Sequence, residues 1–252
     1  MKVLVKKVAS RMNLKLAAVI LFVLVGFGSI SATAQPTIKF EPDKRGTITE
    51  KEVVKKLKAH FGEDTKGLKE KEFIAEFGAG TTEIGTKAFS DCNEMILTSL
   101  PVDLKSIGEF AFLFCESIEL TSLPNKITNI PRMAFMGCKN IETMTLPTGL
   151  KSIDYDAFAD CEYLETIIIP TGIININACS FAGCKNLKEI TILATKPPVI
   201  PSREIGDIER VFEAECLPET CILYVPASAV NTYKNSDWNI IFNNKIKPIP
   251  KK

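Results

Sequence analysis

The chain has only one histidine, His60, and it lacks the short motifs that mark common catalytic sites. It contains no G-x-S-x-G nucleophile elbow, no phosphate-binding loop, no G-x-G-x-x-G and no H-E-x-x-H. A serine–histidine–aspartate arrangement would have to recruit His60, which we expect at the end of a helix. Acid pairs such as Asp156 and Asp160 have no neighbour that would separate their pKa values, as an acid–base pair requires. We therefore expect a protein that is not an enzyme, with no catalytic residues, no metal site and no cofactor.

Acidic residues are absent from the segment before Gln35, where the charged residues are Lys2, Lys6, Lys7, Arg11 and Lys15. An uncharged apolar run from Leu16 to Ile30 follows, and then Ser31-Ala32-Thr33-Ala34. This order is typical of a secretory signal peptide that is cleaved after Ala34. The alternative is an uncleaved anchor, but the run is shorter than the roughly 20 residues that span a bilayer. The first cysteine is Cys92, so the cleavage point lacks the cysteine of a lipoprotein.

Without the segment before Gln35, the count of Lys and Arg falls from 31 to 26 against 30 Asp and Glu, a net charge of −4. This balance argues against nucleic acid as a partner. No second apolar run of spanning length follows, so we expect no transmembrane segment in the mature chain. The protein is expected to be exported, and to be secreted, periplasmic or on the cell surface.

Five units of 23 residues repeat along the middle of the chain. In each unit an isoleucine is followed five residues later by a phenylalanine, and a cysteine comes three residues after that. The isoleucines are Ile84, Ile107, Ile130, Ile153 and Ile176; the phenylalanine column is Phe89, Phe112, Phe135, Phe158 and Phe181; the cysteine column is Cys92, Cys115, Cys138, Cys161 and Cys184. A fixed period of this length predicts a solenoid.

A short strand is expected after each cysteine, and equivalent strands of neighbouring coils should pair in a parallel sheet. In the third unit Met144 and Leu146 alternate with Thr143 and Thr145. The strand period of two places the first pair in the core and the second pair on the sheet surface. Pro147 then ends the strand.

The first two units, Leu97-Thr98-Ser99-Leu100 and Leu120-Thr121-Ser122-Leu123, do not follow this alternation. Either Thr98 and Thr121 are buried and hydrogen-bonded, or a local bulge turns Leu97 and Leu120 inward. Because the repeat length is unchanged, we expect the aligned register, with Leu97 and Leu120 facing outward.

The segment Ile107-Gly108-x-x-Ala111-Phe112-x-x-Cys115, followed by an apolar strand and Leu-Pro, resembles the BspA-like leucine-rich repeats of bacterial, Bacteroides-type surface proteins. The stretch Leu223-Tyr224-Val225-Pro226, with the later Tyr233 and Trp238, is similar to the closing segment of such proteins. The resemblance implies adhesion to host matrix proteins and to other cells. The departures are Pro131, Asp154 and Asn177 in place of the glycine after isoleucine, and Ser180 in place of alanine.

The parts on either side of the repeats are expected to cover the ends of the solenoid. Thr49 and Glu52 form a capping box, and an apolar stripe of Val53, Val54, Leu57 and Phe61 predicts a helix that Gly62 ends. The alternative for this helix is an independent small domain. At the other end Lys196-Pro197-Pro198 break the period, and Trp238 is expected at the centre of a cap.

The sequence therefore predicts an α/β solenoid: a right-handed leucine-rich-repeat coil with a short parallel sheet, a 23-residue period, a helical N-terminal cap and an irregular C-terminal cap. The predicted parts are a signal peptide (1–34), an N-terminal helical cap with a partial repeat (35–83), five leucine-rich repeats (84–198), and a degenerate repeat with a C-terminal cap (199–252).

The chain has eight cysteines, and cysteines of exported proteins commonly form disulfides. Side chains at equivalent positions of neighbouring coils point in the same direction, whereas a disulfide needs a specific dihedral angle between its two side chains. We therefore expect the cysteine column to consist of buried thiols. Zinc or disulfides are the alternatives for this column. Cys216 and Cys221 lie outside it and are the better candidates for a disulfide.

We expect a secreted or cell-surface leucine-rich-repeat protein that acts as a protein-binding or adhesion module. The alternative is a structural or envelope-organising solenoid without a host ligand. The expected partner is a protein, such as a host matrix protein or another surface protein. The expected binding surface is the concave sheet face, made of Leu97, Ser99, Leu120, Ser122, Thr143, Thr145, Thr166, Ile168, Glu189 and Thr191. Hydroxyls with a few aliphatic residues suit a protein contact, although serine and threonine also suit any sheet surface.

Overall fold

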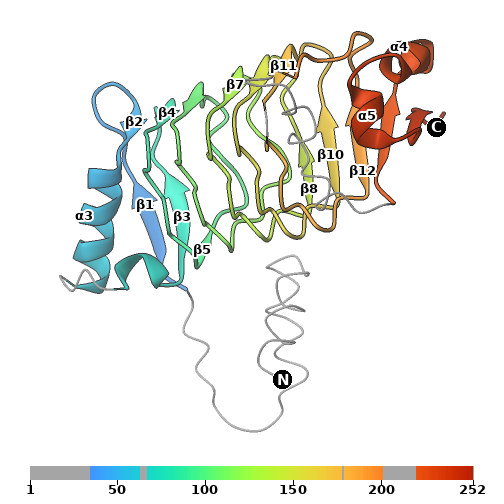
Figure 1. The fold of residues 1–252 in the computed structure, drawn as a ribbon. Coiled ribbons are helices and arrows are strands. Elements are labelled where there is room, and N and C mark those ends of the chain that lie inside the picture. The colour runs from blue at the N-terminus through green and yellow to red at the C-terminus, as the bar shows by residue number, and fades with distance from the viewer. Residues whose placement is uncertain (1–34, 63–66, 178, 201–219, 252) are drawn as a thin grey trace, which may run out of the picture. The chain divides into compact units, whose positions relative to one another are not determined.

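The computed structural model describes residues 35–62, 67–177, 179–200 and 220–251. The predicted signal peptide, residues 1–34, lies outside the described residues. From Gln35 onward the chain forms one compact unit. Figure 1 shows this unit as a stack of coils, with α3 and β1 at its N-terminal end and α4 and α5 at its C-terminal end.

Short parallel strands follow one another along two sides of the stack (Figure 1). One side carries β1 (Thr37–Phe40), β3 (Phe73–Phe77) and β5 (Met95–Ile96), and farther along β8 (Thr143–Thr145), β10 (Thr166–Ile169), β12 (Glu189–Ile192), β13 (Ile222–Val225) and β14 (Ile246–Pro248). The other side carries β2 (Thr47–Ile48), β4 (Glu83–Ile84), β6 (Ser106–Ile107), β7 (Asn129–Ile130), β9 (Ser152–Ile153) and β11 (Asn175–Ile176). Partner residues in neighbouring repeats lie 23 positions apart, as Asn129 and Ser152 do.

The phenylalanine column forms the centre of the core, and all five of its side chains are fully buried. Neighbouring rings stack nearly parallel, with centroids 5.3–5.7 Å apart and interplanar angles of 4–9°. Identical residues at identical places in successive coils bring the rings into this arrangement. The predicted inward position of these phenylalanines is confirmed.

The cysteine column runs beside the phenylalanine column, and its members are buried free thiols, as predicted. Four of them donate an Sγ–H···O bond of 3.0–3.3 Å to the phenylalanine carbonyl of the preceding coil, as Cys138 does to Phe112. Burial raises the pKa of every thiol in the column, to about 12 for Cys92. These thiols therefore serve as small core residues.

A turn segment closes each coil between the isoleucine and the cysteine, and it contains two residues with left-handed backbone angles. The first position is Lys87, Phe110, Met133, Asp156 and Cys179 in successive coils; the second is Asp91, Phe114, Gly137, Asp160 and Gly183. Left-handed geometry costs a non-glycine residue roughly 1–2 kcal/mol, and least for asparagine and aspartate. Phenylalanine at both positions of one coil is thus unfavourable for the backbone.

The N-terminal helix α3 (Glu50–Phe61) occurs where the sequence predicts it. Thr49 Oγ1 accepts a hydrogen bond of 3.3 Å from the Glu52 amide, and Gly62 ends the helix with φ 97°. Val53 and Leu57 are buried, and α3 packs against β1. The short 3₁₀ helix η1 (Leu68–Glu70) follows.

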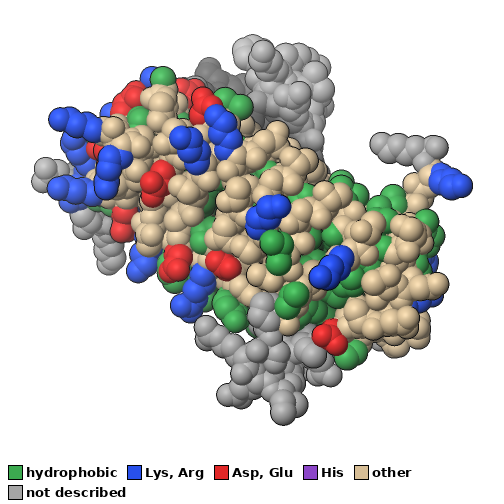
Figure 2. Space-filling model, turned by 90° about the horizontal axis from the view of Figure 1, so that it is seen from above, with side chains coloured by type: hydrophobic (Ala, Val, Ile, Leu, Met, Phe, Trp, Pro, Cys, Tyr) green, Lys and Arg blue, Asp and Glu red, His purple; other side chains and the backbone are tan. Residues whose placement is uncertain are grey.

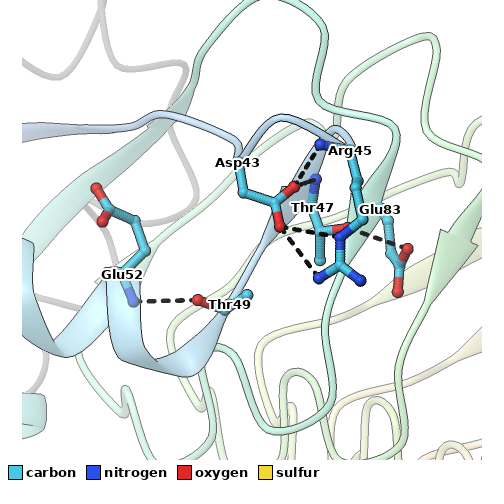
Figure 3. Close-up of polar contacts among 6 residues, drawn as sticks. All are labelled: Asp43, Arg45, Thr47, Thr49, Glu52 and Glu83. Carbon is cyan, nitrogen blue, oxygen red and sulfur yellow. Dashed lines mark hydrogen bonds and ion pairs between the residues drawn. The ribbon is translucent and has the colours of Figure 1, made fainter.

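The loop before α3 is organised by Asp43 (Figure 3). Its carboxylate accepts hydrogen bonds from the amides of Arg45 at 2.8 Å and Thr47 at 3.0 Å. These amides lower the pKa of Asp43, and the Arg45 guanidinium adds to the effect. Thr47 Oγ1 in turn donates to Glu83 at 3.1 Å, which links this loop to the next coil.

At the C-terminal end β13 pairs with β12 and is followed by η3 (Ala227–Ala229), α4 (Val230–Lys234) and α5 (Trp238–Phe242). Trp238 is buried, and its Nε1 donates to the Pro198 carbonyl at 3.0 Å. Tyr233 donates its hydroxyl to the Ala194 carbonyl at 3.0 Å. Both bonds join the terminal helices to the last repeat.

Cys221 is a buried free thiol, which does not support the predicted disulfide with Cys216; Cys216 lies outside the described residues.

Figure 2 looks onto the side of the stack that is at the top of Figure 1. Lys and Arg side chains gather over its N-terminal end, and hydrophobic side chains are more frequent toward its C-terminal end (Figure 2). Ile174 and Val199, next to β11, are 54% and 55% exposed. This side of the stack is therefore rich in basic side chains near its N-terminal end and more hydrophobic near its C-terminal end.

Candidate functional site

The strands β8, β10, β12 and β13 present two columns of side chains away from the core, because their alternate residues fill it. Met144, Ile167 and Ile190 point inward and are buried. The outward columns follow from the register: Thr143, Thr166, Glu189 and Ile222 in the first, and Ser122, Thr145, Ile168, Thr191 and Tyr224 in the second. We call these two columns, together with Ser99, the sheet face.

Eight of the ten predicted binding residues lie on this face. Ser99, Ser122, Thr143, Thr145, Ile168 and Glu189 are exposed, and Thr166 and Thr191 are half-buried. Strand pairing brings the β8, β10 and β12 members together, with Thr143 beside Thr166 and Thr166 beside Glu189. Their part in binding stays a prediction.

The other two predicted residues, Leu97 and Leu120, do not belong to the face, and the expected register of the first two repeats is wrong there. Leu97 is 2% exposed and Leu120 is 1% exposed, whereas Thr98 and Thr121 face solvent. Burying a leucine stabilises by roughly 1.5–3 kcal/mol, while a buried threonine hydroxyl needs a hydrogen-bond partner. The chain therefore turns the leucines inward and leaves two successive residues outward in each unit.

This local change interrupts the sheet. In the described part of the chain, no strand lies on this side between β5 and β8. One isolated β-bridge, from Ser122 to Thr145, and backbone hydrogen bonds such as that from the Glu119 amide to the Leu97 carbonyl at 2.9 Å join the coils there. Ser99 and Ser122 thus sit on irregular backbone, whereas Thr143 and Thr166 sit on regular strands. The continuous part of the sheet face begins at β8.

Two residues of the face were missed from the sequence. Ile222 pairs with Glu189, and Tyr224 pairs with Thr191, so both columns continue onto β13. Both follow their partners at a spacing longer than the repeat period, which hides them from the repeat pattern. The signal that could have found them is the apolar strand Leu223-Tyr224-Val225 before a proline, which has the form of the repeat strands.

An acidic column borders the face, formed by Glu119, Glu142 and Glu165 at equivalent positions of successive coils; Glu142 and Glu165 come directly before the first outward position. Lys188 pairs with Glu165 at 2.8 Å. Burial raises the pKa of the half-buried Glu119, and the charge of Glu142 raises it further. One rim of the sheet face is therefore negative.

Other kinds of site are not formed by the described residues. No three His, Cys, Asp or Glu side chains among them are placed to hold a metal ion. Within the same part of the chain, none of the helices has the length and apolar character that a membrane crossing needs. His60 is exposed at the end of α3, with its ring edge-on to Phe61 at 4.7 Å.

Comparison with protein families matches residues 76–197 to the BspA type leucine rich repeat region, in six copies. These residues are BspA-type leucine-rich repeats. A comparison with the curated proteins finds no match.

Solved structures similar to this chain include a leucine-rich repeat protein from Bacteroides ovatus, with 26% identity, 59% of this chain and 44% of that chain covered, and a TM-score of 0.38. The pneumococcal vaccine antigen PcpA shows 15% identity over 86% of this chain and 68% of that chain, with a TM-score of 0.37. A leucine rich cell surface protein from Faecalibacterium prausnitzii shows 16% identity over 71% and 79%, with a TM-score of 0.30. The chain spans less than half the length of the Bacteroides ovatus protein.

Three of the four departures from the BspA-type pattern, Asp154, Asn177 and Ser180, form hydrogen bonds on the β7–β9–β11 side. Asp154 stands where the first two repeats have glycine, and its carboxylate accepts hydrogen bonds from Asn129 Nδ2 at 3.3 Å and Asn177 Nδ2 at 3.1 Å. Ser180, also a departure, donates to the Asp154 carbonyl at 3.2 Å. At Gly108 a Cβ would lie 2.3 Å from the Thr86 nitrogen, so no side chain fits there. Asp154, Asn177 and Ser180 therefore link neighbouring BspA-type repeats by hydrogen bonds.

Proposed function

We propose that this protein is an exported, non-enzymatic leucine-rich-repeat protein that binds another protein through the sheet face. The observation that supports this proposal is the pair of outward columns on β8, β10, β12 and β13, which the core does not need. Export rests on the predicted signal peptide. The partner is a protein such as a host matrix protein or another surface protein, and the role is adhesion.

The chemistry of the face fits a protein contact. Ile168 is 39% exposed near the middle of the second column, and Tyr224 is half-buried farther along it. Threonine and serine hydroxyls surround them, and glutamates border one edge. An apolar centre with a polar rim is the usual composition of a protein–protein interface.

In this proposal, the unit from Gln35 onward is a right-handed coil that has a 23-residue period and a cap at each end. The boundaries are those predicted from the sequence, with caps in 35–83 and 199–252 and the repeats in 84–198. Support comes from α3, which packs beside β1, and from Trp238 and Tyr233, which bond to the last repeat. A coil covered at both ends leaves its sides as the binding surfaces.

The test changes Thr143 and Thr166 together to arginine. They are neighbours on paired strands and point away from the core, so the double variant should fold as the parent does. Two bulky charges at the middle of the face should weaken binding about tenfold or more, some 1.4 kcal/mol. The matched control changes Thr148 and Thr171 to arginine, because these exposed threonines lie in the same two coils but in the turns after Pro147 and Pro170.

Partners are to be captured with the mature protein from host matrix proteins and, separately, from the cell's own envelope. Affinity for the captured partner is then measured with the parent and both double variants. If Thr143→Arg with Thr166→Arg binds as well as the parent, the sheet face is only a scaffold and the proposal fails. Capture of envelope components alone, with no loss of binding in the Thr143→Arg, Thr166→Arg variant, would instead support the structural, envelope-organising alternative.

A further inference from the structure

The outer edge of β14 is a feature that the proposed function does not use. β14 is the terminal strand of the sheet that carries the sheet face, and among the described strands it pairs with β13 alone. Figure 1 shows it at the C-terminal end of the stack. A strand at the edge of a sheet presents free amides and carbonyls, to which another strand can pair by hydrogen bonding. The chemistry of this edge therefore decides whether a further strand can join the sheet there.

The residues of β14 alternate in the direction of their backbone hydrogen bonds. The Leu223 amide donates a bond of 3.1 Å to the Lys245 carbonyl, and the Ile249 amide donates a bond of 2.8 Å to the Val225 carbonyl. In a parallel pair, alternate residues of a strand bond to the same neighbour, so Lys247 also faces β13. The residues whose backbone groups face the outer edge are Ile246, Pro248 and Pro250.

Two of these three outward positions are prolines, which have no amide hydrogen to donate. A proline that faced β13 would remove a hydrogen bond from the existing sheet, whereas Pro248 and Pro250 leave the pairing with β13 unchanged. In the segment 246–250 the Ile246 amide is the one outward donor that remains. The outer edge can therefore accept hydrogen bonds but has a single amide to donate.

The terminal helix α4 does not cover this part of the edge. α4 packs against β14, and Ile246 is buried, but Pro248 and Pro250 are exposed. The outer edge of a second copy would otherwise fit, because two identical edges can pair antiparallel about a twofold axis. With prolines at these positions, four of the six amides that such a pair would use are missing, and their carbonyl partners would lose water without gaining a donor.

We propose that Pro248 and Pro250 close the C-terminal edge of the sheet to strand addition, and so prevent two copies of this chain from joining through β14. Copies could then lie close together without merging their sheets into one. This inference does not depend on binding by the sheet face, so either proposal can fail alone.

The test replaces both prolines with valine, which favours strands and restores an amide hydrogen at each position. The variant Pro248→Val with Pro250→Val should pair with a second copy through β14. Its self-association, measured by sedimentation equilibrium, should be about tenfold tighter or more than that of the mature parent protein. Hydrogen exchange of the amides in 246–251 should also slow as the concentration of the variant rises, because the new amides are bonded only in the pair.

The matched control is Lys247→Val with Lys251→Val. It places two valines in the same segment and removes two positive charges, but it adds no amide hydrogen, because lysine already has one. Equal self-association of the control and the proline variant would show that apolar side chains cause the association, and would overturn the proposal. A proline variant that associates no more than the parent would overturn it as well.

Circular dichroism melting checks that each protein is folded. Pro250→Val alone, at a position beyond the last residue of β14, should show the same effect in weaker form and replaces the double variant if that variant does not fold. Adding Thr143→Arg and Thr166→Arg to both parent and proline variant should leave their difference unchanged. Loss of the difference would place the association on the sheet face and contradict the role of β14.

Discussion

Replacing Phe135 with alanine tests the central packing of the stack. The ring is fully buried and lies between Phe112 at 5.4 Å and Phe158 at 5.3 Å, so the change removes contacts to both neighbouring coils. Loss of apolar burial costs roughly 2–3 kcal/mol, and each lost ring pair adds roughly 0.5–1.5 kcal/mol. The free energy of unfolding should fall by about 4 kcal/mol, inside the range of about 3–5 kcal/mol typical of Phe→Ala in a core.

The measurement is urea unfolding followed both by far-ultraviolet circular dichroism and by the fluorescence of Trp238, the only tryptophan. Trp238 reports on the C-terminal end, so separation of the two transitions would show that the cavity has uncoupled the halves of the stack. The matched control is Val102→Ala, at an apolar residue that is 80% exposed and should change stability by less than about 0.5 kcal/mol. A loss below about 1 kcal/mol for Phe135→Ala would refute the argument that the column couples the coils.

Two further predictions concern ionisable groups. The buried cysteine column should resist alkylation in the native protein, because alkylation requires the thiolate and burial raises the pKa of Cys92 to about 12. Denatured but unreduced protein should expose at least five reactive thiols. A count below five would indicate disulfides. Glu119→Gln should raise stability at pH 7 by less than about 1 kcal/mol, since the half-buried carboxyl has a raised pKa when folded and so costs stability once ionised. The gain should disappear on acidification below about pH 4, where Glu119 is protonated in both states, and a gain equal at both pH values would contradict this cause.

The period of the sequence was sufficient to predict the core but not every outward residue. Phe135 and Cys138 recur at the same place in each coil, so their burial could be inferred from repetition alone. Leu97 and Leu120 could not be placed by alternation, because the chain there leaves two successive residues outward to bury a leucine. Tyr224 was missed because the strand that carries it follows a longer spacing than the repeat.

The stacked rings also bear on how such a protein can change in length. Every coil of the repeat offers the same phenylalanine and cysteine to the coil before and to the coil after, and the ring spacings stay within the narrow range from 5.3 to 5.7 Å. A duplicated or deleted 23-residue segment would therefore meet the same phenylalanine and cysteine in its neighbours, and the terminal helices would still contact the same last coil. Growth by whole coils would extend the outward columns without requiring a new core, so the size of the recognition surface could evolve independently of the packing that supports it.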